Sequence, residues 1–306
     1  MNKKIKKIIT FTTFACSAMY IFNKVIQYIS DQGLTLEENE NYYNWRNGTI
    51  YYTKKGTGKP LLLIHDLNPI SSSYEWNQVI DLLSNDYTVY AIDLLGCGKS
   101  DKPAMSYINY LYVELINDFI KDIIKEKTDL LVTGESFTFA LMASRMNPGT
   151  IDKITAINPT DITYNVQSPS KVSEFMKHVI ETPVLGTFIY NLIHSKSAIT
   201  KQMNQYTFYP TSLPDKLNDI YYETAHLQKN NGKYLYASII GKYTNINIIH
   251  TLKHIDHPIH FISTNQDDAN IKKYVEYNPS IKISYIKNTG YLPQIEYPND
   301  IVKLMN

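Results

Sequence analysis

One segment in the middle of the chain most constrains its fold. Asp129–Thr133 is an apolar run without polar alternation, which is typical of a strand buried on both faces. Gly134-Glu135-Ser136 follows, and Phe139–Met146 has the apolar composition of a helix. A strand, a sharp turn with a serine and a helix form the arrangement that exposes a hydroxyl above a parallel sheet. Ser136 is therefore the candidate nucleophile, although Thr138 stands where this motif has its last glycine.

The same strand and helix alternation recurs on either side of this segment. Apolar runs followed by helical segments predict an α/β fold with a mostly parallel, doubly wound sheet. The other strands of this sheet are expected at Pro60–Ile64, Tyr87–Ile92, Ile154–Ile157, Pro258–Ser263 and Lys282–Ile286. Asn47-Gly48 predicts a hairpin between Tyr42–Arg46 and Thr49–Thr53. Ligands bind such sheets at the carboxyl ends of the strands, where His65, Asp93 and Ser136 are expected.

The alternation stops after residue 159 and resumes after residue 255. The intervening region is helical and rich in aromatic residues, which indicates a helical cap inserted into the α/β core. The predicted organisation is a membrane segment at 1–29, a linker at 30–41, the first part of the core at 42–159, the cap at 160–255 and the second part of the core at 256–306.

The N-terminus has the charge pattern of a membrane segment. Lys3, Lys4, Lys6 and Lys7 precede an apolar run from Ile8 to Phe22. We expect an uncleaved single-pass anchor in the cell membrane, with the N-terminus inside and the domain outside the cytoplasm. A cleaved signal peptide and an amphipathic helix lying on the membrane or on the domain remain alternatives. The net charge of +1 gives no indication of nucleic-acid binding.

Four separated motifs resemble one family. Leu63-Ile64-His65-Asp66 resembles its strand followed by His-Gly, and Ser72-Ser73-Tyr74-Glu75-Trp76 is similar to its Ser-Ser-Tyr-x-Trp. Asp93 to Pro103 resembles its Asp-Leu-x-Gly-x-Gly-x-Ser-Asp-Lys-Pro loop, and Thr289 to Pro298 resembles the segment that holds its histidine. The family is the α/β-hydrolase superfamily, in the capped branch of haloalkane dehalogenases and related esterases. The catalytic motifs are degenerate here. The resemblance is therefore weaker evidence for chemistry than for fold, because function has to be argued from the site.

The resemblance implies roles for several residues. Ser136 would be the nucleophile, and the backbone N–H groups of Leu67 and Phe137 would form the oxyanion hole. Asp66 replaces the family's glycine, and a carboxylate there would oppose a developing oxyanion. Asp267 matches the family's acid; the alternatives are its neighbour Asp268 and Asp161, a position that some dehalogenases use.

The base is the missing part of this expectation. The resemblance assigns the family's histidine to Tyr291, with Gln294 as the nearest other candidate. Tyrosine titrates near pH ~10 and is a poor base at neutral pH. His178, His194 and His226 in the cap are possible replacements, whereas His65 is expected to be structural. No metal or other cofactor is expected, because the histidines at 254, 257 and 260 have no accompanying set of carboxylates.

Two functions follow from these residues and remain open. The first is a hydrolase of an ester or similar acyl bond in a small apolar or aromatic substrate, with Ser136 as nucleophile and an unconventional base. The second is a catalytically inactive relative that binds a small ligand or a protein partner. A cofactor-free lyase or isomerase is a third alternative. Ser136 could also be a helix N-cap without a chemical role. The sequence does not give the oligomeric state.

Overall fold

A single mixed sheet organises the core. The computed structural model of the protein describes residues 3–30, 40–208, 216–265 and 268–305. The strands within these ranges are β1 (Asn41–Trp45), β2 (Gly48–Lys55), β3 (Lys59–Ile64), β4 (Tyr87–Ile92), β5 (Thr128–Thr133), β6 (Ile151–Ile157), β7 (Ile259–Ser263) and β8 (Lys282–Tyr285). Their order in the sheet is β1-β2-β4-β3-β5-β6-β7-β8. Strands β3 to β8 are parallel to one another, and β2 runs antiparallel to both of its neighbours, β1 and β4. The predicted α/β class with a mostly parallel sheet is confirmed.

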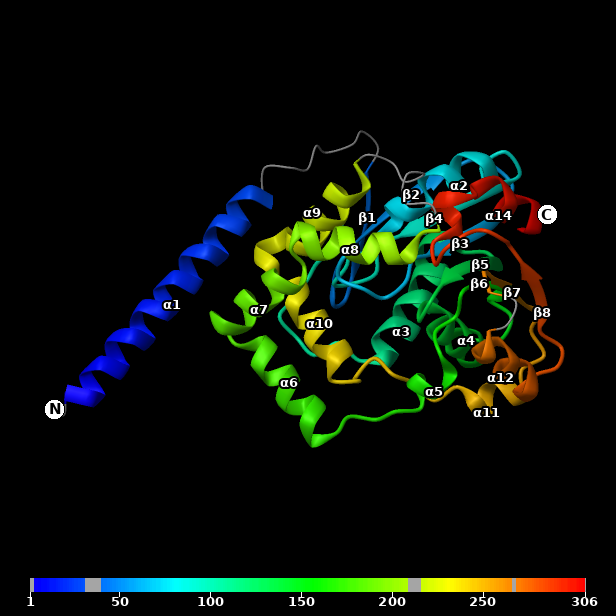
Figure 1. Ribbon diagram of the computed structural model, residues 1–306. Helices are drawn as coiled ribbons and strands as arrows, with labels where there is room; N and C mark the ends of the chain where they lie inside the picture. The colour runs from blue at the N-terminus through cyan, green and yellow to red at the C-terminus, as the bar shows by residue number, and fades with distance from the viewer. Residues whose placement is uncertain (1–2, 31–39, 209–215, 266–267, 306) are drawn as a thin grey trace.

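Helices cover both faces of this sheet (Figure 1). The helices of the core are η1 (Ser73–Trp76), α2 (Asn77–Leu83), α3 (Asn109–Phe119), the π-helical turn η2 (Ile120–Ile124), α4 (Ser136–Met146), α11 (Ile249–Lys253), α12 (Ala269–Tyr277), α13 (Pro293–Glu296) and α14 (Pro298–Met305). Side chains alternate between the two faces of β3. Leu61 and Leu63 pack with Trp76 in one buried cluster, and Leu62 and Ile64 pack with Phe119 in the other. The sheet is thus doubly wound, as predicted.

Two predicted local features bear directly on the site. The Asn47-Gly48 hairpin is present, because Trp45 pairs with Gly48 in the antiparallel ladder of β1 and β2. The helix expected from Phe139 begins three residues earlier, at Ser136. Ser136 therefore belongs to the first turn of α4.

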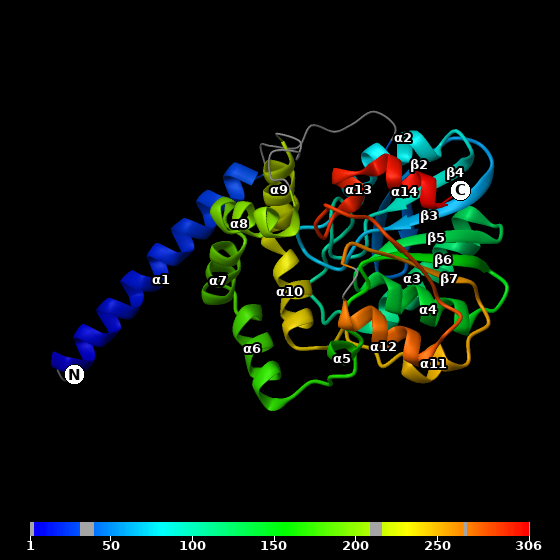
Figure 2. The same cartoon turned by 45° about the vertical axis from the view of Figure 1, so that its right-hand side comes forward.

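A group of helices between β6 and α11 forms the cap. These helices are α5 (Ile162–Asn165), α6 (Lys171–Glu181), α7 (Leu185–Ile193), α8 (Lys196–Tyr206), α9 (Leu217–Asn230) and α10 (Gly232–Ile240). Figure 2 shows α6, α7, α9 and α10 standing beside the core. The cap is fixed to the loop after β4, where the Lys102 N–H donates to Gln228 Oε1 (2.8 Å) and the Tyr107 N–H donates to Ser238 Oγ (2.9 Å).

A long N-terminal helix, α1 (Lys3–Ser30), projects from the cap (Figure 1). Its C-terminal part packs on α7 and α9. The rings of Phe22 and Phe188 meet edge to face at 5.3 Å, and Asn23 Nδ2 donates to the Val184 carbonyl (3.0 Å). Asn191 Nδ2 donates in turn to Asn23 Oδ1 (3.0 Å). By length and composition alone, α1 can cross a membrane.

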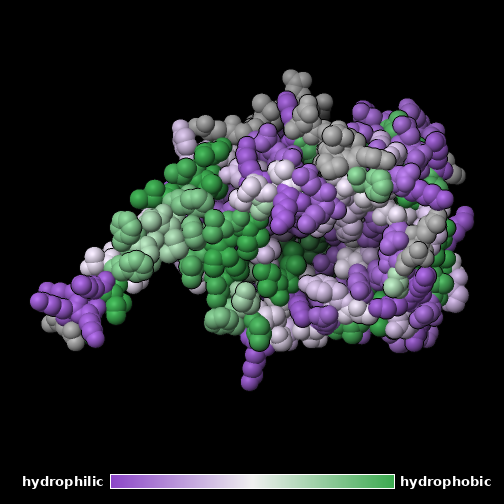
Figure 3. Space-filling model, in the orientation of Figure 1, coloured by the Kyte–Doolittle hydropathy of each residue, from purple (hydrophilic) through white to green (hydrophobic). Residues whose placement is uncertain are grey.

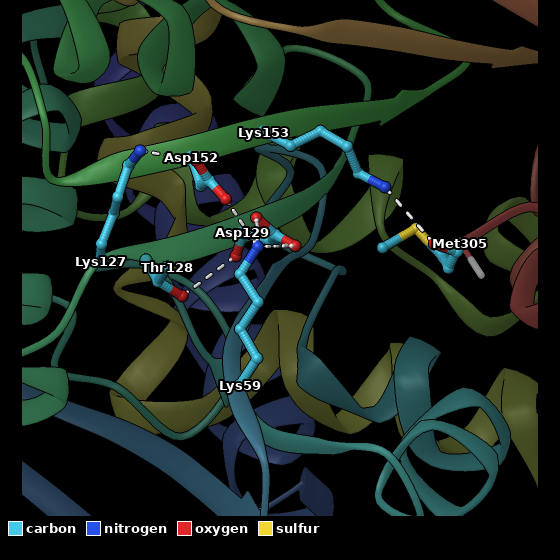
Figure 4. Close-up of polar contacts among 7 residues, drawn as sticks. All are labelled: Lys59, Lys127, Thr128, Asp129, Asp152, Lys153 and Met305. Carbon is cyan, nitrogen blue, oxygen red and sulfur yellow. Dashed lines mark hydrogen bonds and ion pairs between the residues drawn. The ribbon is translucent and has the colours of Figure 1, made fainter.

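A charged cluster joins the amino ends of three central strands (Figure 4). Lys59 Nζ contacts Asp129 Oδ1 (2.8 Å) and Asp152 Oδ2 (2.7 Å). Lys127 Nζ lies 2.6 Å from the second oxygen of Asp152. Hydrogen bonds from Lys127 and Lys59 lower the pKa of Asp152 to about 2. The Asp129 side chain is only 6% exposed, and Lys59 Nζ donates to both of its carboxylate oxygens (2.8 and 2.9 Å).

We expect the Lys59→Met substitution to destabilise the protein by about 1–3 kcal/mol, because it leaves a buried carboxylate without its donor. The matched control is Lys55→Met. Lys55 pairs with Asp81 at the surface, where the two side chains are 56% and 70% exposed. That substitution should change the free energy of unfolding by less than about 0.5 kcal/mol. Chemical denaturation in detergent measures both values, and equal losses would contradict the assigned role of Lys59.

Candidate active site

The turn between β5 and α4 has the geometry of a nucleophile elbow, but its sharp position is Gly134. Gly134 directly follows β5 and has φ +55°. In such an elbow, the residue at the strained turn carries the reacting side chain, and the N–H of the next residue helps to bind the oxyanion. Glu135 is the next residue and has helical backbone angles. Residue 134 therefore occupies the elbow position, and because it is a glycine it has no side chain that could act as a nucleophile.

Ser136 lies two residues beyond this position and points into the protein. Its side chain has no exposed surface, and its Oγ donates to the His65 carbonyl oxygen (2.6 Å). Within the described residues, which include all eight histidines, no histidine ring hydrogen-bonds to Ser136. The hydroxyl therefore joins α4 to the end of β3 rather than facing a cavity above the sheet.

The Asp66 carboxylate fills the expected oxyanion hole. Its Oδ1 accepts hydrogen bonds from the Leu67 N–H (2.9 Å) and the Glu135 N–H (2.8 Å). The expectation for the hole combined Leu67 with Phe137. In the structure, the N–H that converges with that of Leu67 belongs to Glu135, whereas the Phe137 N–H is directed at the Gly134 carbonyl (3.4 Å). Two convergent backbone donors are present, but a side-chain oxygen of the protein occupies them.

The same carboxylate also takes the space of an elbow side chain. A Cβ atom built on Gly134 would lie 2.2 Å from Asp66 Oδ1 and 2.3 Å from Asp66 Cγ. Both distances are far shorter than a van der Waals contact, so a side chain at 134 and the present position of the Asp66 carboxylate exclude each other. The positive φ of Gly134 adds a second reason for glycine there.

Tyr291 holds the other oxygen of this carboxylate. Its hydroxyl donates to Asp66 Oδ2 (3.1 Å). The backbone of Tyr291 is fixed on both sides, because its N–H donates to the Tyr206 carbonyl and its own carbonyl accepts from Asn158 Nδ2 (2.9 Å). Burial, followed by the charge of Asp66, raises the pKa of Tyr291 well above its ordinary value. The tyrosine is therefore a hydrogen-bond donor here and is unsuited to remove a proton from a serine at neutral pH.

Two further buried acids lie near Asp66. Burial raises the pKa of Glu75 to about 8, and burial together with the charge of Asp66 raises that of Glu135 to about 8. Burial also raises the pKa of Asp66, although part of its side chain reaches a small cavity and its three hydrogen bonds oppose the shift. Gln294, the alternative candidate for the base, is fully buried, and its Nε2 lies 3.4 Å from Glu75 Oε2.

The cavity beside this group is small. It measures about 10 Å³, which is room for roughly one water molecule. Asp66, Glu75 and Tyr291 line it from the core, and Tyr206 and Tyr221 line it from the cap. In this arrangement the site has no space for an organic substrate.

A larger cleft lies between the core and α9. It has a volume of about 480 Å³. Its lining combines aromatic, hydroxyl and charged side chains, among them Tyr51, Tyr74, Thr224, Lys216 and Glu223. This range of chemistry fits a ligand with both polar and apolar groups better than a purely apolar one.

Neither of the two described candidate acids, Asp161 and Asp268, completes a triad. Asp267 lies outside the described residues. Asp268 is the N-cap of α12 and accepts from the Asn270 N–H (2.8 Å). Asp161 is the N-cap of α5 and accepts from the Thr163 N–H (2.7 Å). Both aspartates thus stabilise helix ends.

The histidines have structural environments. His65 is buried, with Nδ1 next to the Asp66 carbonyl (2.7 Å) and Nε2 accepting from the Leu94 N–H (3.0 Å). His194 and His226 are buried in the cap against the carbonyls of their own helical turns, whereas His178 is exposed. Within the described ranges, no group of three or more His, Cys, Asp or Glu side chains is placed to hold a metal ion.

Sequence reasoning noted Asp66 as a departure but did not anticipate where its side chain would lie. It also assigned the elbow to the serine of Gly134-x-Ser136. The usable signal was the combination of an unusual acid after His65 with a glycine directly after the apolar strand. Together they fit an elbow that has no side chain of its own and whose space is filled by a side chain from the neighbouring loop after β3.

The buried acids predict that stability depends on pH. Glu75 and Glu135 have an ordinary pKa of 4.5 and a folded value of about 8. The folded state therefore binds more protons, and the stability that this contributes is full below pH 4.5 and is lost as pH rises to about 8. We expect Tm in detergent to fall by at least about 5 °C between pH 5 and pH 8.

The Glu75→Gln/Glu135→Gln double variant should remove most of this dependence. Glu114→Gln, a change at an exposed ion pair, should leave it intact. A wild-type Tm that rises over the same pH interval, or an unchanged slope in the double variant, would contradict the protonated state of these two acids.

Comparison with known proteins agrees with this fold. A sequence model of the family described as "alpha/beta hydrolase fold" matches residues 59–283. A 2-hydroxy-6-oxo-6-(2'-aminophenyl)hexa-2,4-dienoic acid hydrolase from Metapseudomonas resinovorans is 35% identical over 83 residues, which cover 27% of this chain and 29% of that protein. The alpha/beta hydrolase domain-containing protein VTE7 of Arabidopsis thaliana is 25% identical over 273 residues, covering 81% of this chain and 76% of that protein.

Solved structures resemble the chain over most of its length. The Cfl2 protein of Burkholderia cenocepacia superposes with a TM-score of 0.72 at 14% identity, covering 87% of this chain and 94% of its own. A bacterial membrane phospholipase A superposes with a TM-score of 0.64 at 17% identity, covering 100% of this chain and 97% of its own. The match to the family extends over more than half of the chain and includes β3 to β7, the elbow and the cap. The chain therefore belongs to the α/β-hydrolase family, as its motifs predicted.

Proposed function

We propose that this protein is a membrane-anchored binding protein on an α/β-hydrolase scaffold, without serine-hydrolase turnover. One observation carries the proposal: the Asp66 carboxylate occupies both the oxyanion hole and the space of the elbow side chain. A serine hydrolase needs both places free for the acyl group and the nucleophile.

The alternative with Ser136 as nucleophile and Tyr291 in place of the histidine has less support. A serine hydroxyl needs a base within hydrogen-bonding reach, and that of Ser136 is buried and directed at a carbonyl. A triad enzyme that loses its base retains ~10³-fold catalysis from its oxyanion hole and substrate binding. That residual route requires an open hole, which Asp66 fills. We infer that Ser136 has a structural role.

The cleft of about 480 Å³ is the proposed binding site. Its charged groups are partly neutralised within the protein, because Lys99 pairs with Glu40 (2.6 Å) and Asp219 pairs with Lys196 (2.8 Å). Tyr51 and Tyr74 add aromatic surface. We infer a small ligand with an apolar or aromatic body and a polar group, which narrows the expected class of small apolar or aromatic molecules.

The anchor is assigned to α1. Its length and composition suit a membrane span, and four lysines lie at its free end. The excess of lysine before the span favours an N-terminus in the cytoplasm and a domain outside it. We therefore propose a single-pass protein of the cell membrane with its N-terminus in the cytoplasm.

A second candidate activity is favoured by the position of Asp66 itself. Its Oδ1 is bound by two backbone N–H groups, its Oδ2 accepts from the Tyr291 hydroxyl, and Asp66 lines the small cavity. A carboxylate held in this way can attack an electrophilic carbon, forming an ester as the bond to the leaving group breaks, and water then cleaves the ester. The cavity of about 10 Å³ would first have to widen. Turnover of an epoxide or haloalkane that is lost in Asp66→Asn would favour this candidate.

The main prediction concerns a fluorophosphonate probe, which labels activated serines. We expect the full-length protein to remain unlabelled and to hydrolyse p-nitrophenyl esters no faster than its Ser136→Ala variant. We expect the Asp66→Gly/Gly134→Ser/Tyr291→His variant to acquire labelling, because it vacates the hole and supplies a nucleophile and a base.

The Asp66→Gly/Tyr291→His variant is the matched control, since it opens the same space without a serine at the elbow. It should stay unlabelled. Labelling of the wild-type protein that disappears in Ser136→Ala would refute the binding-protein proposal and restore Ser136 as the nucleophile.

A second prediction concerns the cleft. Aromatic carboxylate and amine fragments, observed by saturation-transfer NMR, should bind the wild-type protein and lose binding in Ile220→Trp, which fills the cleft from α9. Val166→Trp, at a position that is 40% exposed and outside the cleft lining, should retain binding. Equal binding by the wild type and Ile220→Trp would exclude this cleft as the ligand site.

A further inference from the structure

The cap carries an apolar surface next to the anchor helix. Six large apolar side chains of α6 and α7 are between 41% and 73% exposed. They are Val172, Phe175, Met176, Leu185, Leu192 and Ile193. Figure 3 shows hydrophobic surface continuing from α1 over α7 towards α6, and we call these six residues the cap face.

The contact between α1 and the cap fixes the position of this face relative to a bilayer. Phe22, Asn23 and Ser30 are the points where α1 is held or buried by the rest of the protein. The apolar part that precedes this contact, from Ile8 to Ile21, has 14 residues and a length of about 21 Å. The hydrocarbon core of a bilayer is about 30 Å thick.

The remaining distance of about 9 Å has to be covered by the part of α1 that packs on α7 and α9. A helix that spans the bilayer therefore brings the adjoining cap into the outer leaflet. Lys24 does not prevent this, because its long exposed side chain can extend to the headgroups. The depth matches the roughly 5–10 Å by which amphipathic surfaces enter the interface.

We propose that the cap face is a second membrane-binding surface, which inserts into the headgroup and acyl boundary beside α1. This inference rests on the anchor assigned to α1 above. The occupant is the lipid bilayer, because the apolar surface of the cap face is continuous with that of the helix that crosses it. The protein is then held at two places and cannot rotate freely about a single tether.

The test measures the depth of single residues in liposomes that contain the full-length protein. Cys97 is buried, so Cys16 on the exposed side of α1 takes a fluorescent NBD label in the wild-type chain and reports on the anchor. In a Cys16→Ser background, labels at Phe175→Cys and Leu192→Cys report on the cap face. Lys303→Cys is the matched control, because its side chain is 75% exposed on α14, far from α1.

We expect nitroxide lipids to quench the labels at 175 and 192 at least about twofold more than the label at 303. A quenched label at Cys16 with labels at 175 and 192 no more quenched than that at 303 would overturn the cap-face proposal and leave the anchor intact. Quenching at 175 and 192 without quenching at Cys16 would support the cap face and refute the span.

Two further outcomes have a defined meaning. If none of the labels is quenched, both proposals are refuted. If the labels at 175 and 192 are blue-shifted but not quenched, a second copy of the chain covers the cap face, and the membrane proposal is overturned. A Phe175→Glu/Leu192→Glu variant with its label on Cys16 confirms that α1 still inserts when the cap face is made polar.

Discussion

The site depends on one carboxylate and the three donors around it. Asp66 receives two backbone N–H groups from different segments, the loop after β3 and the turn after β5, and a hydroxyl from the segment before α13. It therefore connects three parts of the chain that meet above the sheet. These three hydrogen bonds stabilise the site in its filled state. A ligand that used the same donors would first have to displace the Asp66 carboxylate.

Three acids are buried in one region, where the loss of solvation destabilises their ionised forms and hydrogen bonds only partly offset this loss. Asp66, Glu75 and Glu135 all have raised pKa values, and burial is the main cause in each case. Ionised neighbours of like charge would repel each other strongly in this environment, and protonation of Glu75 and Glu135 beside the Asp66 carboxylate avoids that repulsion. Structural groups are seldom assembled in this way, and perturbed acids are commonly the mark of a site that has or had a chemical role.

The sheet and the cap were predictable from sequence, because uninterrupted apolar runs and a break in their alternation are strong signals. Leu130, Leu131 and Val132 are fully buried in a central strand, as their pattern indicates. The site was less predictable. The spacing of Gly134 and Ser136 pointed to the serine as the elbow residue, and only the backbone angles and the hydrogen bond of Glu135 identify residue 134 as the turn. The direction of the Asp66 side chain follows from tertiary contacts, which a local pattern does not contain.

The mutual exclusion between Asp66 and any side chain at residue 134 has an evolutionary consequence. A nucleophile introduced at Gly134 alone would collide with the carboxylate, and removal of the carboxylate alone would leave an empty hole without a nucleophile. Each single step lacks the benefit of the pair, so the two positions are epistatic. Serine chemistry on this scaffold would therefore require changes at both positions, because neither change alone supplies an open hole together with a nucleophile.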